Sequence, residues 1–346
     1  MAGRKWKSKK KKRSGCAGLL AGIFLLVLLA VGAAIWLVLV PYGPETETFV
    51  EVAPGSSTAL IGRQLEAAGV IRSQFAFDLL RFWKRGKLQA GEYRFDHEAP
   101  ATEVYARIAR GDVFTITLTV PEGANIFDIA ARIEQVGFGT RHEFLDAAVE
   151  RAGLVSDLDP GAKSLEGYLF PDTYRFARKT TPAQIATAMV RRFRVVAGQL
   201  ELKQNVHEVV TIASLVERET AVDAERPLVA SVFENRLAKK MPLMTDPAVI
   251  YGLELSGGWR GTIEKTDLKR DTAYNTYLHN GLPPGPIANP GVRSLRAAMK
   301  PTQTDYFYFV AAGTDAQGRS LFSNTLEEHD KQVAEYRHAL RKAGER

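Results

Sequence analysis

The chain has 346 residues, of which 45% are hydrophobic, 25% charged and 9% aromatic. This length suits about two to three domains with hydrophobic cores, and the composition excludes a disordered, collagen-like or low-complexity chain. The one cysteine, Cys16, excludes an intramolecular disulfide framework and a thiolate-rich zinc site. The net charge of +7 comes from residues 1–13, which hold eight Lys or Arg, so the other 38 basic residues nearly balance 39 acidic ones. This distribution argues against a nucleic-acid-binding protein.

An uncharged apolar stretch of 25 residues, 16–40, follows the basic tail. As an α-helix it would be about 37 Å long, enough to cross a hydrocarbon layer of ~30 Å. We therefore expect a transmembrane helix over residues 15–41. A cleaved signal peptide is the alternative, but the apolar run continues past the small residues at 32–34. Residues 1–14 should stay in the cytoplasm, facing anionic inner-membrane lipid, and the rest of the chain should be periplasmic.

Two later stretches, residues 49–75 and 116–144, share a pattern. Each has a short alternating run, a turn with Pro and Gly, an amphipathic helix and a closing glycine. The tripeptide at 93–95, Tyr-Arg-Phe, recurs at 174–176. We predict two α+β units, over 45–114 and 115–200, each in the order strand, helix, helix, strand, helix. They resemble LysM-like carbohydrate-binding modules and suggest an internal duplication; two ordinary space-filling units are the alternative.

The third segment, residues 201–335, begins with a strongly apolar helix that ends in Glu217 and Glu219. On a helix these two carboxyl groups lie about 200° apart, so they cannot face the same cleft. Glu219 follows Ile212 and Leu215 on a bulky apolar face, where burial would raise its pKa and favour a proton donor. We expect it on the last turn of a buried helix, beside an opening. The alternative is a salt bridge from one or both glutamates to Arg218, Arg226 or Arg236.

Several long motifs in this part of the chain closely resemble the MltG-type (YceG-like) endolytic murein transglycosylases. They are IASLVERETAVDAERPL from residue 212, LMTDPAVIYGL from 243, TAYNTY from 272, GLPPGPIANPG from 281, YFYFVA from 306 and EGYLFPDTY from 166. The resemblance implies a bitopic inner-membrane protein that cuts the β-1,4 bond between N-acetylmuramic acid and N-acetylglucosamine within glycan strands, leaving 1,6-anhydro ends. The family's catalytic glutamate aligns with Glu219. The implied fold class is α+β: one transmembrane helix, LysM-like βααβ modules and a lysozyme-like mixed catalytic domain, before a polar tail at 336–346.

Further polar residues are weaker candidates for binding the substrate. They are Glu217, Asp246, Tyr274, Asn275, Tyr277 and Glu166. Each has a structural alternative: Asp246 would cap a helix, the tyrosines would be core, Asn275 would cap a turn, and Glu166 would pair with an arginine. The stiff loop at 281–291 is expected to form one wall of the glycan cleft, and His329 to be solvated.

No spacing of His, Cys or Asp suggests a metal site, and no glycine-rich loop suggests a nucleotide, so we expect neither metal nor cofactor. Expected partners are peptidoglycan glycan strands, cell-wall synthases and inner-membrane lipid. Two other functions remain open. One is a non-catalytic, membrane-tethered glycan-binding scaffold, and the other is a water-using muramidase with Glu217 or Asp246 as the second carboxylate.

Overall fold

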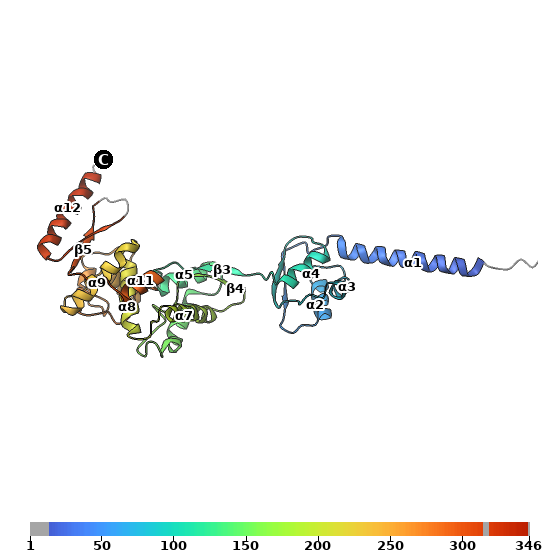
Figure 1. The fold of residues 1–346 in the computed structure, drawn as a ribbon, viewed down its shortest axis with the longest axis horizontal. Helices are drawn as coiled ribbons and strands as arrows, with labels where there is room; N and C mark the ends of the chain where they lie inside the picture. The colour runs from blue at the N-terminus through green and yellow to red at the C-terminus, as the bar shows by residue number, and fades with distance from the viewer. Residues whose placement is uncertain (1–13, 314–317, 345–346) are drawn as a thin grey trace, which may run out of the picture. The chain divides into compact units, whose positions relative to one another are not determined.

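The computed structural model describes residues 14–313 and 318–344, and the chain divides into two compact units (Figure 1). The first unit is Met1–Thr115 and the second is Ile116–Arg346. Each has its own cluster of buried apolar side chains. The predicted cytoplasmic tail falls on residues that, apart from the first residue of the first helix, lie outside the described range.

The first helix, α1 (Ser14–Leu39), is apolar along its length. Among the described helices it is the one long and apolar enough to cross a membrane, with a hydropathy of 2.8 for Gly18–Leu39 and no burial within the protein. Its end is tied to the rest of the first unit by a cation–π contact. The guanidinium of Arg72 lies 4.4 Å from the ring centre of Trp36 and 4.8 Å from that of Tyr42.

The rest of the first unit is a two-stranded sheet packed against three helices. Its elements are β1 (Thr48–Val52), α2 (Thr58–Ala67), α3 (Gln74–Lys84), β2 (Gly91–Phe95) and α4 (Ala101–Arg110). The strands are antiparallel, with Val50 opposite Tyr93. The hydroxyls of Ser57 and Ser73 cap α2 and α3 by accepting hydrogen bonds from first-turn N–H groups. Tyr93 and the inner side chains of the helices form the core.

The second unit opens with the same order of elements. They are β3 (Ile116–Thr119), α5 (Ile126–Val136), α6 (Arg141–Glu150), a 3-10 turn (Ala152–Val155), β4 (Thr173–Phe176) and α7 (Pro182–Gln199). The predicted succession of strand, helix, helix, strand, helix is therefore confirmed in both places. The register also corresponds, because Leu118 faces Tyr174 as Val50 faces Tyr93. Gly137 closes α5 in the left-handed conformation, with φ of 84°.

The remainder of the second unit is mainly helical. Its elements are α8 (Val206–Glu219), α9 (Arg226–Ala238), α10 (Asp246–Leu255), α11 (Val292–Met299), β5 (Tyr308–Ala311), β6 (Ser320–Ser323) and α12 (Leu326–Gly344), with 3-10 turns at Asp223–Glu225 and Asp267–Lys269. One core runs from Leu118 to Ala298, so the segments expected as a second α+β unit and a separate catalytic domain share a single interior. Residues 336–344, expected as a polar tail, continue α12.

The architecture confirms a mixed α and β class, with three two-stranded antiparallel sheets among the described residues. Asp223, which lies between α8 and α9, pairs through its carboxylate with Arg226 and Arg293. It lies in a 3-10 turn, and α9 begins after this turn with a proline in its first turn.

Candidate active site

A cavity of about 450 Å³ in the second unit is lined by Glu219. Its apolar walls include Phe233, Leu243 and Phe309, and its polar groups include Arg236, Asp246, Tyr277 and His329. These side chains come from helices α8, α9, α10 and α12, from strand β5 and from two loops. A concave site that combines apolar walls with convergent polar groups is a candidate ligand site.

Glu219 reaches the cavity because α8 ends there. Ile212, Leu215 and Val216, on the same helix, are at most 3% exposed, so the apolar face of α8 is buried in the core. Thr220 is extended, with φ of −138° and ψ of 134°, and terminates the helix directly after Glu219. The position that the sequence predicts, the last turn of a buried helix beside an opening, is the one observed.

The environment of Glu219 favours its protonated form. Burial raises the pKa of this carboxyl to about 7, and the carboxylate of Asp246 acts in the same direction. The Arg236 guanidinium opposes them with a smaller effect. Within the described part of the chain, no group donates a hydrogen bond to Glu219 that would stabilise its ionised form. A large fraction of the carboxyl is therefore protonated near neutral pH, as a proton donor requires.

Arg236 is a buried cation at the wall of the cavity. Its Nε donates to the carbonyl of Phe307 at 2.7 Å and its Nη1 donates to that of Leu243 at 2.6 Å. The guanidinium also lies over the ring of Tyr308, 5.4 Å from the centroid. Burial lowers the pKa of Arg236. Since two carbonyls hold its donors, the charge stays fixed beside Glu219 without forming an ion pair with it.

Asp246 and Tyr277 form a hydrogen-bonded pair in the same cavity. The Tyr277 hydroxyl donates to Oδ1 of Asp246 at 2.6 Å, and burial together with this bond raises the pKa of the phenol. Thr245, not Asp246, caps α10, because its hydroxyl accepts from the N–H of Ala248. Asp246 occupies the first helical position, and its carboxylate is free of the capping role that the sequence suggested.

The part of the chain that forms the cavity matches a known protein family. A model of the YceG-like family matches residues 50–335, which include every residue of the cavity. The chain belongs to the YceG-like family. Glu219 on α8 and Asp246 on α10 lie well inside the matched range.

Two relatives named for an activity and one relative of known crystal structure are similar to this chain. The chain is similar to an endolytic murein transglycosylase of Bacillus subtilis, with 35% identity over 314 residues that cover 84% of this chain and 85% of the relative. An endolytic murein transglycosylase of Streptococcus pneumoniae is 31% identical over 333 residues, covering 86% of this chain and 60% of that protein. A crystal structure of a YceG-like protein from Listeria monocytogenes has 34% identity and a TM-score of 0.56, and covers 83% of this chain and 99% of the other.

In this YceG-like chain, Glu217 does not line the Glu219 cavity. Its side chain is 5% exposed and pairs with Arg226 at 2.7 Å. Its second oxygen accepts from the backbone N–H of Gly291 at 2.9 Å. Both oxygens are therefore bound within the protein. The geometry fits the salt-bridge alternative and does not support a contact between Glu217 and substrate.

Glu166 is also a structural group, and it does not pair with an arginine. It is 3% exposed, and its carboxyl accepts from the N–H of Ile126 at the start of α5 and from Nδ2 of Asn289. The hydroxyl of Tyr251 is a further partner. Burial raises the pKa of Glu166 to about 8. It lines a small separate cavity, so the structure does not bring it to Glu219.

The motif at 272–277 contributes one residue to the cavity and two to the scaffold. Tyr277 lines the cavity, as described. Asn275 is fully buried, and its side chain binds the backbone of Leu268, Arg270 and Tyr277, which fits the turn-capping alternative. Tyr274 packs edge-on against Tyr251, with centroids 5.0 Å apart. It lines the cavity of Glu166, not that of Glu219.

The proline-rich loop at 281–291 is not a wall of the Glu219 cavity. Its second half is buried, and its backbone is bound by side chains of the core. The N–H of Ile287 donates to the hydroxyl of Ser214 on α8, and Asn289 bonds to the backbone of Ala124 and Leu169. The expectation of a cleft wall was therefore wrong for this cavity.

Three residues of the cavity were missed or misjudged from the sequence. Arg236 was considered only as a salt-bridge partner, and Tyr308 only as part of a family motif. His329 was expected to be solvated, but it lines the cavity and stacks on Tyr308 with centroids 5.2 Å apart. Burial lowers the pKa of His329. Its position on a polar helix did not indicate a cavity residue, because its contact with Tyr308 depends on the strand pair β5–β6 against which α12 packs.

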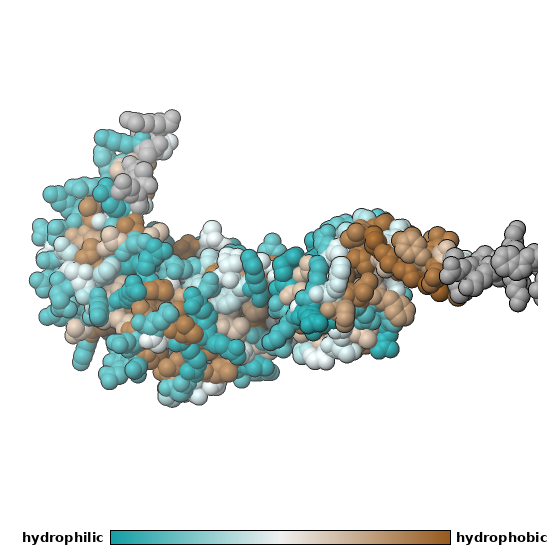
Figure 2. Space-filling model, turned by 45° about the vertical axis from the view of Figure 1, so that its right-hand side comes forward, coloured by the Kyte–Doolittle hydropathy of each residue, from teal (hydrophilic) through white to brown (hydrophobic). Residues whose placement is uncertain are grey.

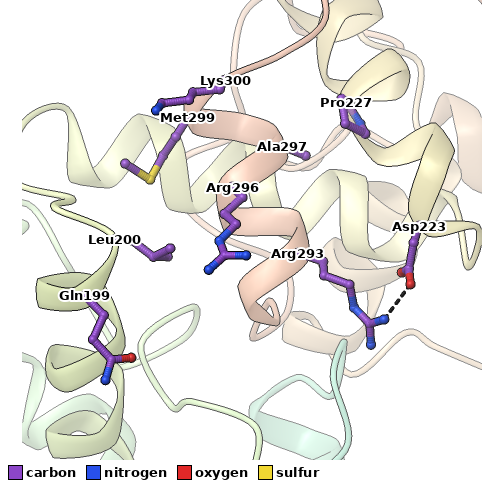
Figure 3. Close-up of a pocket in the computed structure, with 9 residues that line it drawn as sticks. All are labelled: Gln199, Leu200, Asp223, Pro227, Arg293, Arg296, Ala297, Met299 and Lys300. Atoms are coloured by element: carbon purple, nitrogen blue, oxygen red, sulfur yellow. Dashed lines mark hydrogen bonds and ion pairs between the residues drawn. The ribbon is translucent and has the colours of Figure 1, made fainter.

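A second cavity in the same unit, of about 610 Å³, lies between the end of α7 and α11 (Figure 3). Arg293, Arg296 and Lys300 line it, and its one acid, Asp223, pairs with Arg293. It contains no protonated carboxyl and is not a candidate for acid catalysis. In the described ranges 14–313 and 318–344, no group of three His, Cys, Asp or Glu side chains is placed to hold a metal ion.

Proposed function

We propose that this protein is a membrane-anchored lytic transglycosylase that cuts glycan strands of peptidoglycan at internal bonds. The bond cut is the β-1,4 link between N-acetylmuramic acid and N-acetylglucosamine, and the product ends in 1,6-anhydro-muramic acid. Membership of the YceG-like family and similarity to proteins named endolytic murein transglycosylase support the reaction class. The observation that carries the proposal is a glutamate with a pKa of about 7 in a cavity.

The first step is proton donation by Glu219. Its carboxyl O–H donates to the glycosidic oxygen, the bond from that oxygen to C1 of the muramoyl unit breaks, and the bonding electrons stay with the leaving N-acetylglucosamine. Positive charge develops at C1 in an oxocarbenium-like state. A pKa near the working pH suits this step, because the acid is protonated beforehand and releases its proton readily.

The second step uses the substrate's own hydroxyl. The C6 hydroxyl of the muramoyl unit attacks C1, and the Glu219 carboxylate accepts its proton. This closes the anhydro ring, restores the protonated acid and consumes no water. One carboxyl group suffices, whereas a hydrolase needs a second to activate water or to attack C1. The substrate's N-acetyl group can assist at C1.

Asp246, Tyr277 and Arg236 would tune and orient this chemistry. The negative charge of Asp246 keeps the pKa of Glu219 high. The Tyr277 hydroxyl holds the Asp246 carboxylate in place. The charge of Arg236 limits the rise and stabilises Glu219 when it is ionised between the two steps. The aromatic rings of Tyr277 and Tyr308 offer faces for sugar rings.

The anchor would keep the enzyme near the membrane. Helix α1 suits a single membrane span, and the basic residues before it favour a cytoplasmic amino terminus and a periplasmic catalytic unit. A tethered active site reaches the glycan nearest the inner membrane, where strands are made, so wall synthases are the expected partners. The two βααβ units would be duplicated LysM-like modules that contact glycan.

Digestion of purified sacculi tests the proposed reaction. The wild-type chain should release fragments with anhydro-muramoyl ends, and Glu219→Gln should release none. Glu208→Gln is the matched control, because Glu208 is exposed in the first turn of the same helix and should leave the products unchanged. Product masses greater by one water would indicate a muramidase. No products from the folded wild-type chain would indicate a binding scaffold.

A further inference from the structure

The outer face of α3 carries four large apolar side chains that the first unit leaves uncovered. Phe75, Leu79, Phe82 and Trp83 are 72, 46, 71 and 84% exposed. Their spacing places them on one side of the helix, while Phe77 on the opposite side is fully buried in the core. A contiguous cluster of this kind is rare on a soluble surface and marks a contact with another apolar phase.

This α3 patch (Phe75, Leu79, Phe82 and Trp83) adjoins the apolar surface of α1. A groove of about 600 Å³ runs between the two helices, lined by apolar residues of α1 and by Leu79 and Trp83 of α3. Figure 2 shows the brown surface of α1 continuing onto the neighbouring part of the first unit. A single apolar surface therefore extends from the candidate membrane span onto α3.

Basic residues follow the patch directly. Lys84, Arg85 and Lys87 are exposed, and no acidic residue occurs between residues 79 and 91. Aromatic side chains beside lysine and arginine are typical of helices that lie at a membrane surface. There the rings enter the boundary between headgroups and acyl chains, and the cations meet anionic headgroups.

The second unit provides an internal comparison. Helix α6 has the same place in its strand–helix–helix–strand–helix series as α3 has in the first. Its one phenylalanine, Phe144, is fully buried, and its exposed positions include Asp146 and Glu150. The exposed aromatic face is therefore not a requirement of the βααβ unit. It occurs in the copy that adjoins α1.

We propose that the α3 patch is embedded in the outer interface of the same lipid bilayer that α1 spans, with Lys84, Arg85 and Lys87 at its anionic headgroups. This inference rests on the membrane anchoring proposed above. The first unit would then lie against the membrane surface, held by two contacts instead of one. A module fixed in this way sets the distance from the membrane at which the link to the catalytic unit begins.

Lipid-borne quenching of tryptophan fluorescence tests the contact. The full chain is reconstituted into vesicles of phosphatidylglycerol and phosphatidylethanolamine, with bromine atoms on the acyl chains close to the headgroups. Three variants each keep one tryptophan, Trp83, Trp36 or Trp259, and carry phenylalanine at the other tryptophan positions. We expect loss of emission for Trp83 and Trp36, and none for Trp259 in the second unit.

The outcomes separate the two proposals. Quenching of Trp36 with Trp83 emission equal to that of Trp259 would overturn the α3 contact and leave the anchor intact. Absence of quenching at both positions would refute the anchor and the contact together.

A second variant addresses the patch itself. In the chain that keeps Trp83, the combined change Phe75→Ser, Leu79→Ser and Phe82→Ser should restore Trp83 emission and shift it to longer wavelength. Val149→Ser, at an exposed apolar position of α6, is the matched control and should change nothing. Circular dichroism confirms that each variant is folded. Unchanged quenching in the folded triple variant would show that the patch does not bind lipid.

Discussion

Replacing Glu219 with glutamine should make the second unit more stable than the wild type at alkaline pH, and it should remove the activity. Burial and Asp246 raise the pKa of this carboxyl from 4.5 to about 7, so the folded state binds its proton more tightly than the unfolded state. The wild-type chain therefore loses stability as the pH rises from about 4.5 to 7 and keeps that loss above 7. Glutamine has nearly the same shape but carries no charge, so the variant does not lose this stability.

The size of the effect follows from the shift. A rise of about 2.5 pKa units corresponds to about 3 kcal/mol at 1.36 kcal/mol per unit. Because the carboxyl is in contact with the cavity and its solvent, part of this cost is screened, and we expect about 2 kcal/mol. The advantage of the variant should be close to zero near pH 4.5 and complete near pH 8.

Urea unfolding of the detergent-solubilised full chain at pH 5 and pH 8 measures this difference. The stability of Glu219→Gln minus that of the wild type should grow by about 2 kcal/mol between the two conditions. A difference that stays the same between pH 5 and pH 8 would mean that Glu219 is ionised at neutral pH, and the proposed acid step would then have no donor.

Three further substitutions test Asp246 in the cavity and two contacts of the buried scaffold. Asp246→Asn removes a negative charge that raises the pKa of Glu219, so the alkaline limb of kcat/KM measured on glycan strands should move to lower pH; an unmoved limb would contradict this coupling. Glu217→Ala leaves the buried Arg226 with the half-exposed Asp223 as its remaining ion-pair partner and should cost about 3 kcal/mol in unfolding free energy, the lower end of the range for a broken buried pair. Gly167→Ala should cost about 2 kcal/mol or more, since φ is 85° there and a Cβ would lie 2.5 Å from the proline-rich loop. A stable, fully folded Gly167→Ala chain would show that the loop can move aside.

Local patterns in the sequence were enough to predict the elements and the position of the acid. The matching turns and Tyr-Arg-Phe tripeptides gave both strand–helix–helix–strand–helix units, because periodicity and turn residues act over short distances. The same holds for Glu219, whose apolar neighbours lie three to seven residues earlier on one helix. The cap of α10 was misassigned by one residue, as Thr245 and Asp246 are both good capping residues.

Contacts between distant segments could not be predicted in this way. Glu217 meets the backbone of a residue 74 positions away, and Glu166 meets one 40 positions away. Nothing in the spacing of either glutamate identifies those partners. For the same reason His329 was expected in solvent, since its neighbours in the cavity come from other helices and from β5.

Comparison of Glu166 with Glu219 shows that a raised pKa alone does not identify a catalytic acid. Glu166 has a higher pKa than Glu219, about 8 against about 7, but N–H groups of the protein occupy both of its oxygens outside the cavity. Glu217 is likewise bound at both oxygens. Glu219 is half-buried, its oxygens are occupied by no described donor, and it has access to a cavity. Bound carboxyl groups position the loop behind α8, and the unbound one at the helix end remains free to exchange a proton with a substrate.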